Sequence, residues 1–580
     1  MEDGSLQRNG GVKLVRAVEQ LRLPQTVQGI LASRIDRLPG DEKDLLQTLA
    51  VIGKEFPLAL AREVFKKPDD ELGRMLNDLQ LAEFIYEQPA VGDIEYTFKH
   101  ALTRQVAYDS LLVERRRQIH DRTARAIETL KVQQLEDHYG VLARHYLRGT
   151  DVSSALRYTR LAADQAVSRA AYPEAASMLD AALKQLERLP IGAERLRAEM
   201  TLRSIESAAA FAVYGGASTE RERAITRMCE LGEEIGEADQ MLEGLTALSS
   251  LYLVRGECAR GFELTTRCLE LAEPTRDAEV LLDIRWNRAL LAEFGGNLQP
   301  AVPMLEDGLA YAERSNRRYS RDGFLFRTTF KINLAQAFQL LGRDADATKL
   351  AEEGLQHARD SKHLFSICFA LTNQYRAVVR RELEMVRAYT EEGIALSEKC
   401  GFAQWLAAGR VYHGWAVAKL GQLQAGVEEM EKGVATFRRA GGFPREQYAI
   451  ALLAHAYAGM GRSGQALPML NGALAHIERT GQKAEHAEML RLRGEVLLMS
   501  DGAGTQEAEN CFRAALQVAR AQEARWWELR ATTSLGRLLR DTNRRDEARA
   551  MLAEIYDWFS QGFDTADLKD AKALLEELST

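Results

Sequence analysis

A small residue recurs about every 40 residues through the second half of this 580-residue chain. It stands at Gly261, Ala301, Ala347, Ala388, Gly426, Ala466, Ala508 and Ala548. A second small residue, directly followed by an apolar one, comes later in each unit but the last, at Cys268, Gly308, Gly354, Ala395, Gly433, Ala473 and Ala515. Self-similarity at a fixed period is typical of solenoids, in which each supersecondary unit buries its apolar face against its neighbours. The period therefore predicts a stacked array, a kind of fold that usually serves as a binding surface.

One unit shows how the repeat is built. The stretch 405–420 spaces its large apolar residues at helical intervals and ends at Gly421, as a helix with a C-terminal glycine does. In the next stretch, 425–438, Gly426 and Gly433 lie on the same helix face. Other units repeat the turn glycine at Gly256, Gly296, Gly342 and Gly461. We expect two helices joined by a tight turn, with small residues that let neighbouring helices approach closely.

The turn glycine and the small residue after it, as in Gly461 and Ala466, resemble the tetratricopeptide repeat. The period of about 40 residues exceeds the ~34 of that repeat and is nearer to HEAT arrays, but the glycine-turn-alanine pattern favours the tetratricopeptide interpretation. Upstream, Ala155, Ala175 and Ala182 continue the pattern less regularly. We therefore expect an all-α, tetratricopeptide-like superhelix, an α-solenoid, over residues 131–580.

Composition limits the classes of function. The net charge is -8, which argues against nucleic acid as the main ligand because phosphate binding needs a concentrated basic surface. No run approaches the ~18 apolar residues of a membrane span, so no membrane association is expected. The six cysteines are scattered singly, as expected for free thiols in a reducing compartment. These features predict a cytoplasmic protein.

The first 130 residues have a different pattern. The stretches 25–37, 41–51, 57–65 and 69–82 are predicted helices, several started by proline or capped by aspartate. The stretches 84–87 and 94–98 flank Pro89 and Gly92, which predicts a β-hairpin, and a further helix begins at Ala101. Helices followed by a hairpin and another helix predict a small winged-helix domain over residues 1–130.

Several phrases of this region resemble a bacterial protein family. They are Leu23–Val27, Ser33–Pro39, Ala50–Phe56 and Tyr96–Leu102, and the ending Gly562–Lys572 resembles the end of the family's repeat tail. In that family a class III adenylate/guanylate cyclase domain, or another output domain, precedes a signal-transduction ATPase with numerous domains (STAND), followed by tetratricopeptide repeats. The resemblance implies a sensor arm that transmits ligand binding through the winged helix to an ATPase switch.

Catalytic motifs are missing from the sequence. Gly53-Lys54 lacks the upstream glycine and the following Ser/Thr of a phosphate-binding loop. We therefore expect the chain to begin after the NTPase core and to be no enzyme by itself, with an NTPase or cyclase domain as a possible separately encoded partner. The alternatives are a cyclase or ATPase, as in full-length relatives, and a winged-helix transcriptional regulator, for which Arg115-Arg116-Arg117 is the densest basic run.

One residue is a candidate for cofactor binding. His100 stands where the resemblance places a histidine that reaches the β-phosphate of bound ADP, a role it would have here only with an NTPase partner. The alternative is a structural histidine at the start of a helix, whose polar atoms form local hydrogen bonds. No histidine or cysteine spacing fits a metal site, and no catalytic set stands out, so no cofactor is expected.

The predicted ligand surface is the concave groove of the solenoid. The expected occupant is a protein, a peptide or a small effector. Aromatic residues at helical spacing, Trp405, Tyr412, Trp415, Trp526 and Trp527, either line that groove or pack the repeats together, and packing is the more frequent role of such residues.

Overall fold

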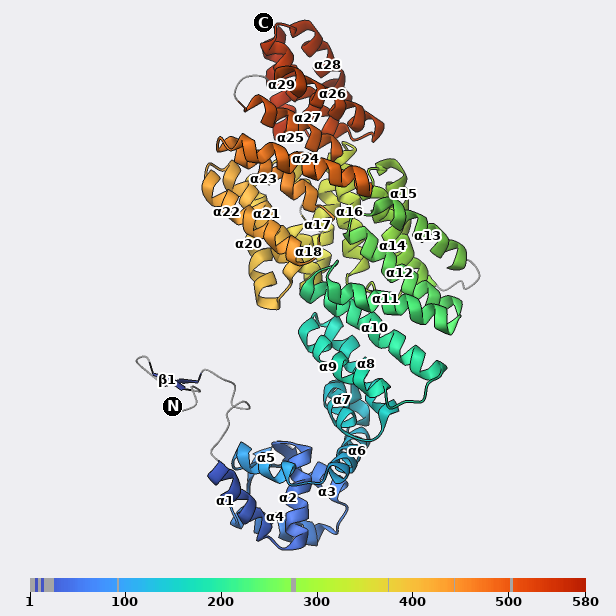
Figure 1. The fold of residues 1–580 in the computed structure, drawn as a ribbon, viewed down its shortest axis with the longest axis vertical. Coiled ribbons are helices and arrows are strands. Elements are labelled where there is room, and N and C mark those ends of the chain that lie inside the picture. Colours follow the sequence, from blue (N-terminus) through green and yellow to red (C-terminus); the bar gives the residue numbers. More distant parts are fainter. Residues whose placement is uncertain are drawn as a thin grey trace. The chain divides into compact units, whose positions relative to one another are not determined.

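The structure is a computed structural model that describes residues 6–8, 12–14, 25–90, 93–272, 278–373, 375–442, 444–500 and 504–579. The chain divides into two compact units. Unit 1 comprises Met1–Ala162 and Lys184–Leu189, and unit 2 comprises Ala163–Leu183 and Pro190–Thr580. Figure 1 shows the elements of each unit, coloured along the sequence.

Unit 1 combines short helices with a small antiparallel sheet. Its helices are α1 (Gln25–Asp36), α2 (Gly40–Ile52), α3 (Leu58–Phe65), α4 (Asp69–Leu81), α5 (Ala101–Asp109), α6 (Val113–Leu130), the 3-10 helix η2 (Val132–His138) and α7 (Tyr139–Arg148). Its strands are β1 (Leu6–Arg8), β2 (Val12–Leu14), β3 (Glu55–Pro57), β4 (Ile85–Ala90) and β5 (Asp93–Phe98). The strands β3, β5 and β4 form one sheet in that order. The predicted hairpin and the predicted short helices are present.

Local sequence explains these elements. Helices α2, α3 and α4 each follow a proline at the N-cap, where the missing N–H is not needed. Helix α4 opens with Asp69 and Asp70, whose charges suit the positive end of the helix dipole. Leu49, Phe56 and Met75 are fully buried in one core shared by the helices and the sheet.

The described part of unit 2 is built from helices and their connections, and the segment between the helices that end at Arg314 and begin at Phe326 forms an isolated β-bridge between Tyr319 and Leu325. Helices α8 (Val152–Ser168) and α9 (Tyr172–Leu186) contain residues of both units. The following helices are α10 (Ala193–Tyr214), α11 (Thr219–Ile235), α12 (Ala238–Val254), α13 (Cys258–Ala272), α14 (Ala278–Phe294), α15 (Leu298–Arg314), α16 (Phe326–Leu340), α17 (Asp344–Asp360), α18 (Leu364–Thr372), α19 (Tyr375–Arg380) and α20 (Leu383–Cys400). They continue with α21 (Ala403–Lys419), α22 (Leu423–Arg439), α23 (Glu446–Gly459), α24 (Ser463–Thr480), α25 (His486–Leu498), α26 (Thr505–Ala521), α27 (Arg525–Asp541), α28 (Arg545–Trp558) and α29 (Ala566–Ser579).

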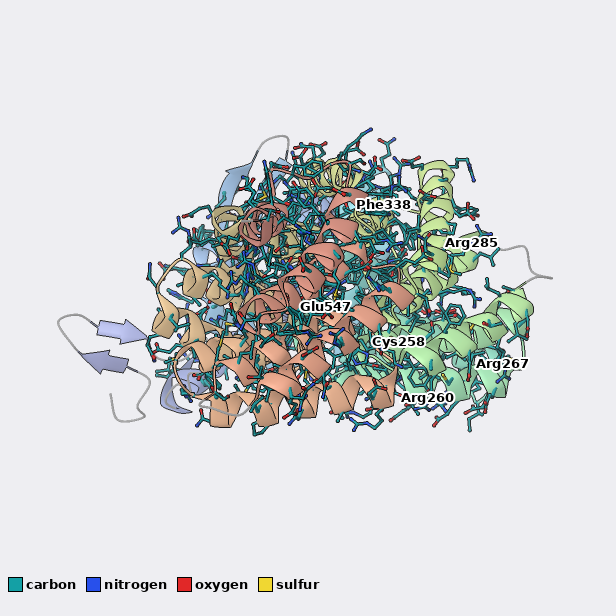
Figure 2. All side chains as sticks on the ribbon, turned by 90° about the horizontal axis from the view of Figure 1, so that it is seen from above. Cys258, Arg260, Arg267, Arg285, Phe338 and Glu547 are labelled. Atoms are coloured by element: carbon teal, nitrogen blue, oxygen red, sulfur yellow. The ribbon has the colours of Figure 1, made fainter. Side chains whose placement is uncertain are left out.

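The two helices of each repeat differ in burial. First helices such as α16 and α27 are buried on nearly all sides. Second helices such as α13 bury one face and expose the other, and Figure 2 shows Arg260 and Arg267 of α13 on the outside of the stack. A helix that is buried all round belongs to an inner layer, and an amphipathic one covers it. The predicted all-α helical-repeat solenoid is confirmed.

The recurring small residues lie where second helices meet first helices. A Cβ added at Gly308 would stand 2.4 Å from the ring of Phe330, and one at Gly426 would stand 2.4 Å from the carbonyl oxygen of Gly414. Such distances leave no room for a side chain larger than hydrogen. The predicted turn residues Gly256, Gly296, Gly342, Gly421 and Gly461 all have positive φ, as a left-handed turn requires.

One position of the predicted register is wrong. Ala388 is exposed, and the fourth residue of α20, which corresponds to Ala347 in α17, is the buried Val386. The small residue that follows on this face is Gly393. The turn before this helix carries Arg381, with φ 57, where most other turns carry glycine, so this turn offers no glycine from which to count the register.

Successive superhelical turns of unit 2 contact one another. Hydrogen bonds join Gly216 N to Gln404 Oε1 (2.9 Å), Lys483 N to the carbonyl of Phe294 (2.8 Å) and Ala345 N to Gln561 Oε1 (2.9 Å). Each bond links segments about 190–220 residues apart in the sequence. Because these bonds run from the helix turns of early repeats to late repeats, we call this contact line the seam. In Figure 1 the green helix α14, which ends at Phe294, accordingly lies near the orange helix α24, which ends shortly before Lys483.

Candidate functional site

The inner layer of unit 2 carries a charged pocket of about 210 Å³. It is lined by Arg381, Trp415, Lys419, Tyr448, Leu452, His455, Glu488, Arg491, Leu492, Glu495, Arg530, Thr533, Ser534, Arg537, Asp567 and Asp570. Most of these side chains come from successive first helices, α21, α23, α25 and α27, and from α29, which pack side by side. The repeat therefore places the same helix face of several units around one cavity, which we call the charged pocket.

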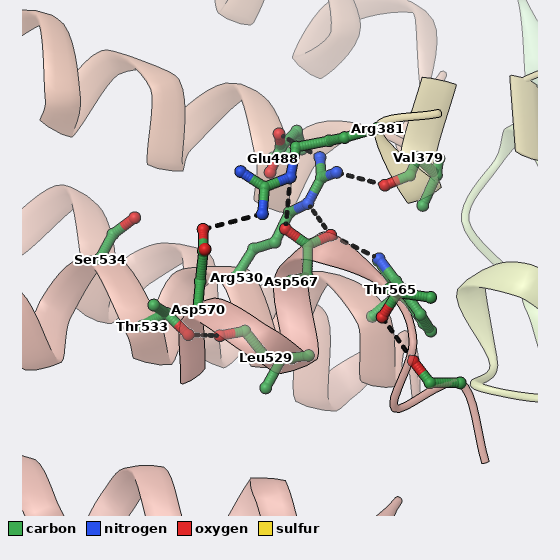
Figure 3. A network of polar contacts seen from close by, with 12 residues as sticks. Val379, Arg381, Glu488, Leu529, Arg530, Thr533, Ser534, Thr565, Asp567 and Asp570 are labelled. Carbon is green, nitrogen blue, oxygen red and sulfur yellow. Dashed lines mark hydrogen bonds and ion pairs between the residues drawn. The ribbon is translucent and has the colours of Figure 1, made fainter. Parts of the chain in front are cut away.

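Arg530 organises the floor of the charged pocket. Its Nε donates to Asp567 Oδ2 and its Nη1 donates to Glu488 Oε1, each at 2.9 Å. Its Nη2 donates to the backbone carbonyl of Val379 (Figure 3). Burial acts to raise the pKa of the Asp567 carboxyl. Ion pairing with Arg530 and Arg381 outweighs that effect, so the pKa is lowered. Removing one partner would leave an uncompensated buried charge, at a cost of ~3–5 kcal/mol, so this set holds the structure together.

Arg381 reaches the pocket from an unusual backbone conformation. Its φ of 57 lies in the left-handed region that favours glycine. Its Nε lies 3.1 Å from Asp567 Oδ1, and its Nη2 lies 2.8 Å from Asp570 Oδ2 (Figure 3).

A second polar group lines the wall made by α23, α25 and α27. Arg491 pairs with Glu488 through its Nε at 2.7 Å and also with Glu495. Glu495 accepts hydrogen bonds from Ser534 Oγ at 3.0 Å and contacts His455 Nε2 at 3.1 Å. Burial acts to raise the pKa of Glu495, but Arg491 and these donors outweigh it and hold the pKa well below its usual range. Glu495 is therefore a fixed anion.

Two cations of the charged pocket do not take part in the strong ion pairs described above. Among the residues that the structure describes, no carboxylate forms an ion pair with Lys419, whose side chain is exposed. Arg537 Nη2 approaches Asp570 Oδ2 only at 3.5 Å, and that oxygen already pairs with Arg381. Lys419 and Arg537 can therefore bind an incoming anionic group without first losing a strong internal partner.

His100 belongs to unit 1 and is not among the residues that line the charged pocket. It is the exposed N-cap of α5, and its carbonyl accepts hydrogen bonds from the N–H groups of Thr103 and Arg104. Its side chain forms no cap bond. The nucleotide-sensing role stays a prediction.

The basic run predicted as a rival DNA contact is paired within unit 1. Arg115 pairs with Asp44, and Arg116 stacks over the ring of Tyr108 at 4.7 Å from its centroid. Arg117 approaches Glu114 at 3.9 Å. All three arginines of the run therefore have acidic or aromatic partners within unit 1.

The aromatic residues proposed for the groove mostly serve packing. Trp405 is 2% exposed and meets Phe211, Phe324, Phe365 and Phe369 at ring-centroid distances of 5.4–6.4 Å. Trp526, Trp527 and Tyr412 are also buried. Of the predicted aromatics, Trp415 lines the charged pocket. The interior of unit 2 is therefore filled in its middle by an aromatic cluster, and the charged pocket lies toward its C-terminal repeats.

Other site types have no support in the described residues. No group of three or more His, Cys, Asp or Glu side chains there could hold a metal ion. No described helix has the length and apolar character of a bilayer span. The cysteines are free thiols, and burial raises the pKa of Cys258, Cys268 and Cys368 to about 12.

No known protein family and no curated protein matches the sequence. Several solved structures resemble the chain at low identity. A Rap protein complexed with competence and sporulation factor is 11% identical, with a TM-score of 0.37 over 73% of this chain and 99% of that one. A STAND protein with a tetratricopeptide repeat sensor from Pyrococcus horikoshii is 11% identical, with a TM-score of 0.30 over 95% of this chain and 66% of that one. The APC/C hetero-tetramer Cut9–Hcn1 is 12% identical, with a TM-score of 0.47 over 96% of this chain and 100% of that one. The chain's own helix alternation and turn register define it as a helical-repeat solenoid.

Sequence reasoning missed most of the pocket. Its charged residues looked like ordinary solvated helix faces, because each repeat contributes only one or two of them. The available signal was Arg381, a non-glycine residue at a turn position that is glycine in most other units.

Proposed function

We propose that this chain is a non-catalytic binding scaffold that captures a peptide segment of a partner in the charged pocket. The observation that carries this proposal is the pair Lys419 and Arg537, which face the cavity without a strong internal partner. Their natural complement is a carboxylate, either a peptide C-terminus or an acidic side chain.

The volume and walls of the pocket favour part of a peptide over a whole small molecule. Its volume of about 210 Å³ lies below the ~300–1,000 Å³ of sites that enclose a small ligand. Trp415, Tyr448 and Leu452 supply an apolar side, and Glu495 and Asp570 supply carboxylate oxygens. An occupant with a carboxylate, a neighbouring apolar side chain and amide N–H groups would match all three surfaces.

We further propose that unit 1 contains a winged-helix module that couples this binding to a STAND-type ATPase and its output domain. The three-stranded sheet with its hairpin, set among α2–α6, supports the module. Transmission would be a population shift, because a ligand moves a switch only when it binds the two states unequally. His100 would then face a nucleotide held by the partner domain.

The test is binding of the purified chain to an array of peptides with free carboxyl termini. We expect a subset to bind, and we expect the double substitution Lys419→Ala/Arg537→Ala to weaken those peptides by about tenfold or more, since hydrogen bonds to charged groups are the strong ones. The matched control is Arg260→Ala/Arg267→Ala, which removes two exposed cations of α13 (Figure 2).

Three results would contradict the proposal. The first is an equal loss of binding in the control variant, and the second is unchanged binding in the pocket variant. The third is a peptide with an amidated C-terminus and no acidic side chain that binds as tightly as peptides that carry a carboxylate. Turnover of ATP or GTP by the chain alone would separately refute the non-catalytic assignment.

A further inference from the structure

A larger cleft of about 700 Å³ lies within unit 1. It is lined by Val51, Ile52, Gly53, Lys54, Glu55, Pro57, Ala59, Leu60, Arg104, Ile127, Leu130, Lys131, His138, Val141, Arg144, His145 and Arg148. These residues come from the end of α2, β3, α3, α5, the end of α6, η2 and α7. We call it the basic cleft. Its volume lies within the ~300–1,000 Å³ range of small-molecule sites.

The charge of the basic cleft is one-sided. Its acidic lining residue, Glu55, pairs with Lys54 at 2.8 Å. Four other cations line the cleft, and within the described residues none of them forms an ion pair: Arg104, Lys131, Arg144 and Arg148. The chain as a whole carries a net charge of -8, so uncompensated cations around one cavity are a local feature and not a consequence of composition.

The arginines of the cleft lie close enough to affect one another's charge. Burial, together with the neighbouring Arg148 and Arg104, lowers the pKa of Arg144. Arg144 and Arg148 lie one turn apart on α7 and project from the same helix face. Like charges held together at this spacing destabilise the empty protein, and an anion bound between them would relieve that repulsion.

The remaining wall of the basic cleft is apolar. Val51, Ile52 and Ile127 are buried beneath it, and Pro57 and Leu60 are partly exposed along it. A ligand that only neutralised the arginines would leave this surface in water. A ligand with an apolar body beside its anionic group would cover both surfaces, with the guanidinium forks on the oxyanion.

We propose that the basic cleft binds a small organic oxyanion, with a phosphate group preferred, whose apolar body packs on Val51, Ile52 and Leu60. Arg104, Arg144 and Arg148 hold the anionic group. His100 does not line this cleft, so the site is separate from the predicted nucleotide-sensing histidine. It is also separate from the charged pocket of unit 2, and its test is independent of the proposed function.

The experiment is titration of the full chain with 1-naphthyl phosphate, followed by calorimetry and by the fluorescence of the probe. Inorganic phosphate tests the contribution of the apolar wall, and 1-naphthoate tests whether a carboxylate substitutes for phosphate. We expect 1-naphthyl phosphate to bind tightest, and Arg144→Gln/Arg148→Gln to weaken it by about tenfold or more. Because much of each side chain is accessible to solvent and neither forms an ion pair with the described residues that the substitution would break, we expect this variant to fold.

The matched control is Arg122→Gln/Arg125→Gln, which removes two exposed cations of α6 outside the cleft. A second cleft variant, Arg104→Gln, tests the contribution of α5. Equal losses in control and cleft variants would overturn the proposal, because they would show general charge attraction. No saturable binding of 1-naphthyl phosphate, or inorganic phosphate binding as tightly, would also overturn it.

Discussion

At the scale of single residues, two histidines give unit 1 a defined pH response. His120 and His145 are buried and share a hydrogen bond between their Nδ1 atoms at 2.9 Å, and Tyr108 contacts His120 Nε2 at 3.0 Å. Burial, and after it the positive charges of nearby arginines such as Arg144 and Arg148, lowers the pKa of each histidine to about 3. Both rings are therefore neutral in the folded protein at neutral pH.

The expected result is a loss of stability in acid. Because the folded pKa lies below the unfolded value of about 6.5, the unfolded chain binds more protons below that pH. Stability is fully present above pH ~6.5 and falls by ~1 kcal/mol for each histidine by pH ~5.5. Hydrogen exchange of α6 and α7 at both pH values measures this effect. The variant His120→Leu/His145→Leu should show a smaller difference in stability between the two pH values. The control His100→Gln, at an exposed position, should show the same difference as the unchanged protein. An unchanged difference in the double variant would refute the assignment.

At the scale of elements, the close approach of α21 and α22 depends on glycine. A Cβ at Gly426 would stand 2.4 Å from the carbonyl oxygen of Gly414, which is backbone and cannot easily move. We expect Gly426→Ala to lower the free energy of unfolding by ~1–3 kcal/mol through overpacking. The control is Gly472→Ala on α24, where nothing lies within 4 Å, and we expect that change to stabilise the helix by ~0.5–1 kcal/mol. Urea midpoints compare the two variants, and equal effects would contradict this packing account.

The sequence predicted elements better than it predicted sites, for physical reasons. Turn glycines and small interface residues are local requirements that recur in every unit, so helices and turns could be predicted. The register failed at Ala388, because Arg381 replaces the glycine that marks the turn in most other units. The charged pocket could not be predicted, since its residues are spread from Arg381 to Asp570 and meet only through the superhelix. The basic cleft joins residues of α5 and α7 that no motif connects.

At the scale of unit 2 as a whole, the seam makes the charged pocket a property of the wound superhelix. Arg530 binds the carbonyl of Val379, and Arg381 binds Asp567 and Asp570, so α27 and α29 are tied to the turn before α20 (Figure 3). A ligand that bridges Lys419 and Arg537 would tighten the same region. Ligand binding and winding of the C-terminal repeats should therefore be coupled.

The most direct test of the central claim is hydrogen exchange of the full chain with and without the tightest-binding peptide from the array. Occupation of the charged pocket predicts slower exchange in α21, α25, α27 and the first turn of α29, with exposed second helices such as α13 unchanged. Protection confined to second helices, or unchanged exchange around Lys419 and Arg537 at saturating peptide, would contradict the claim that this pocket is the binding site.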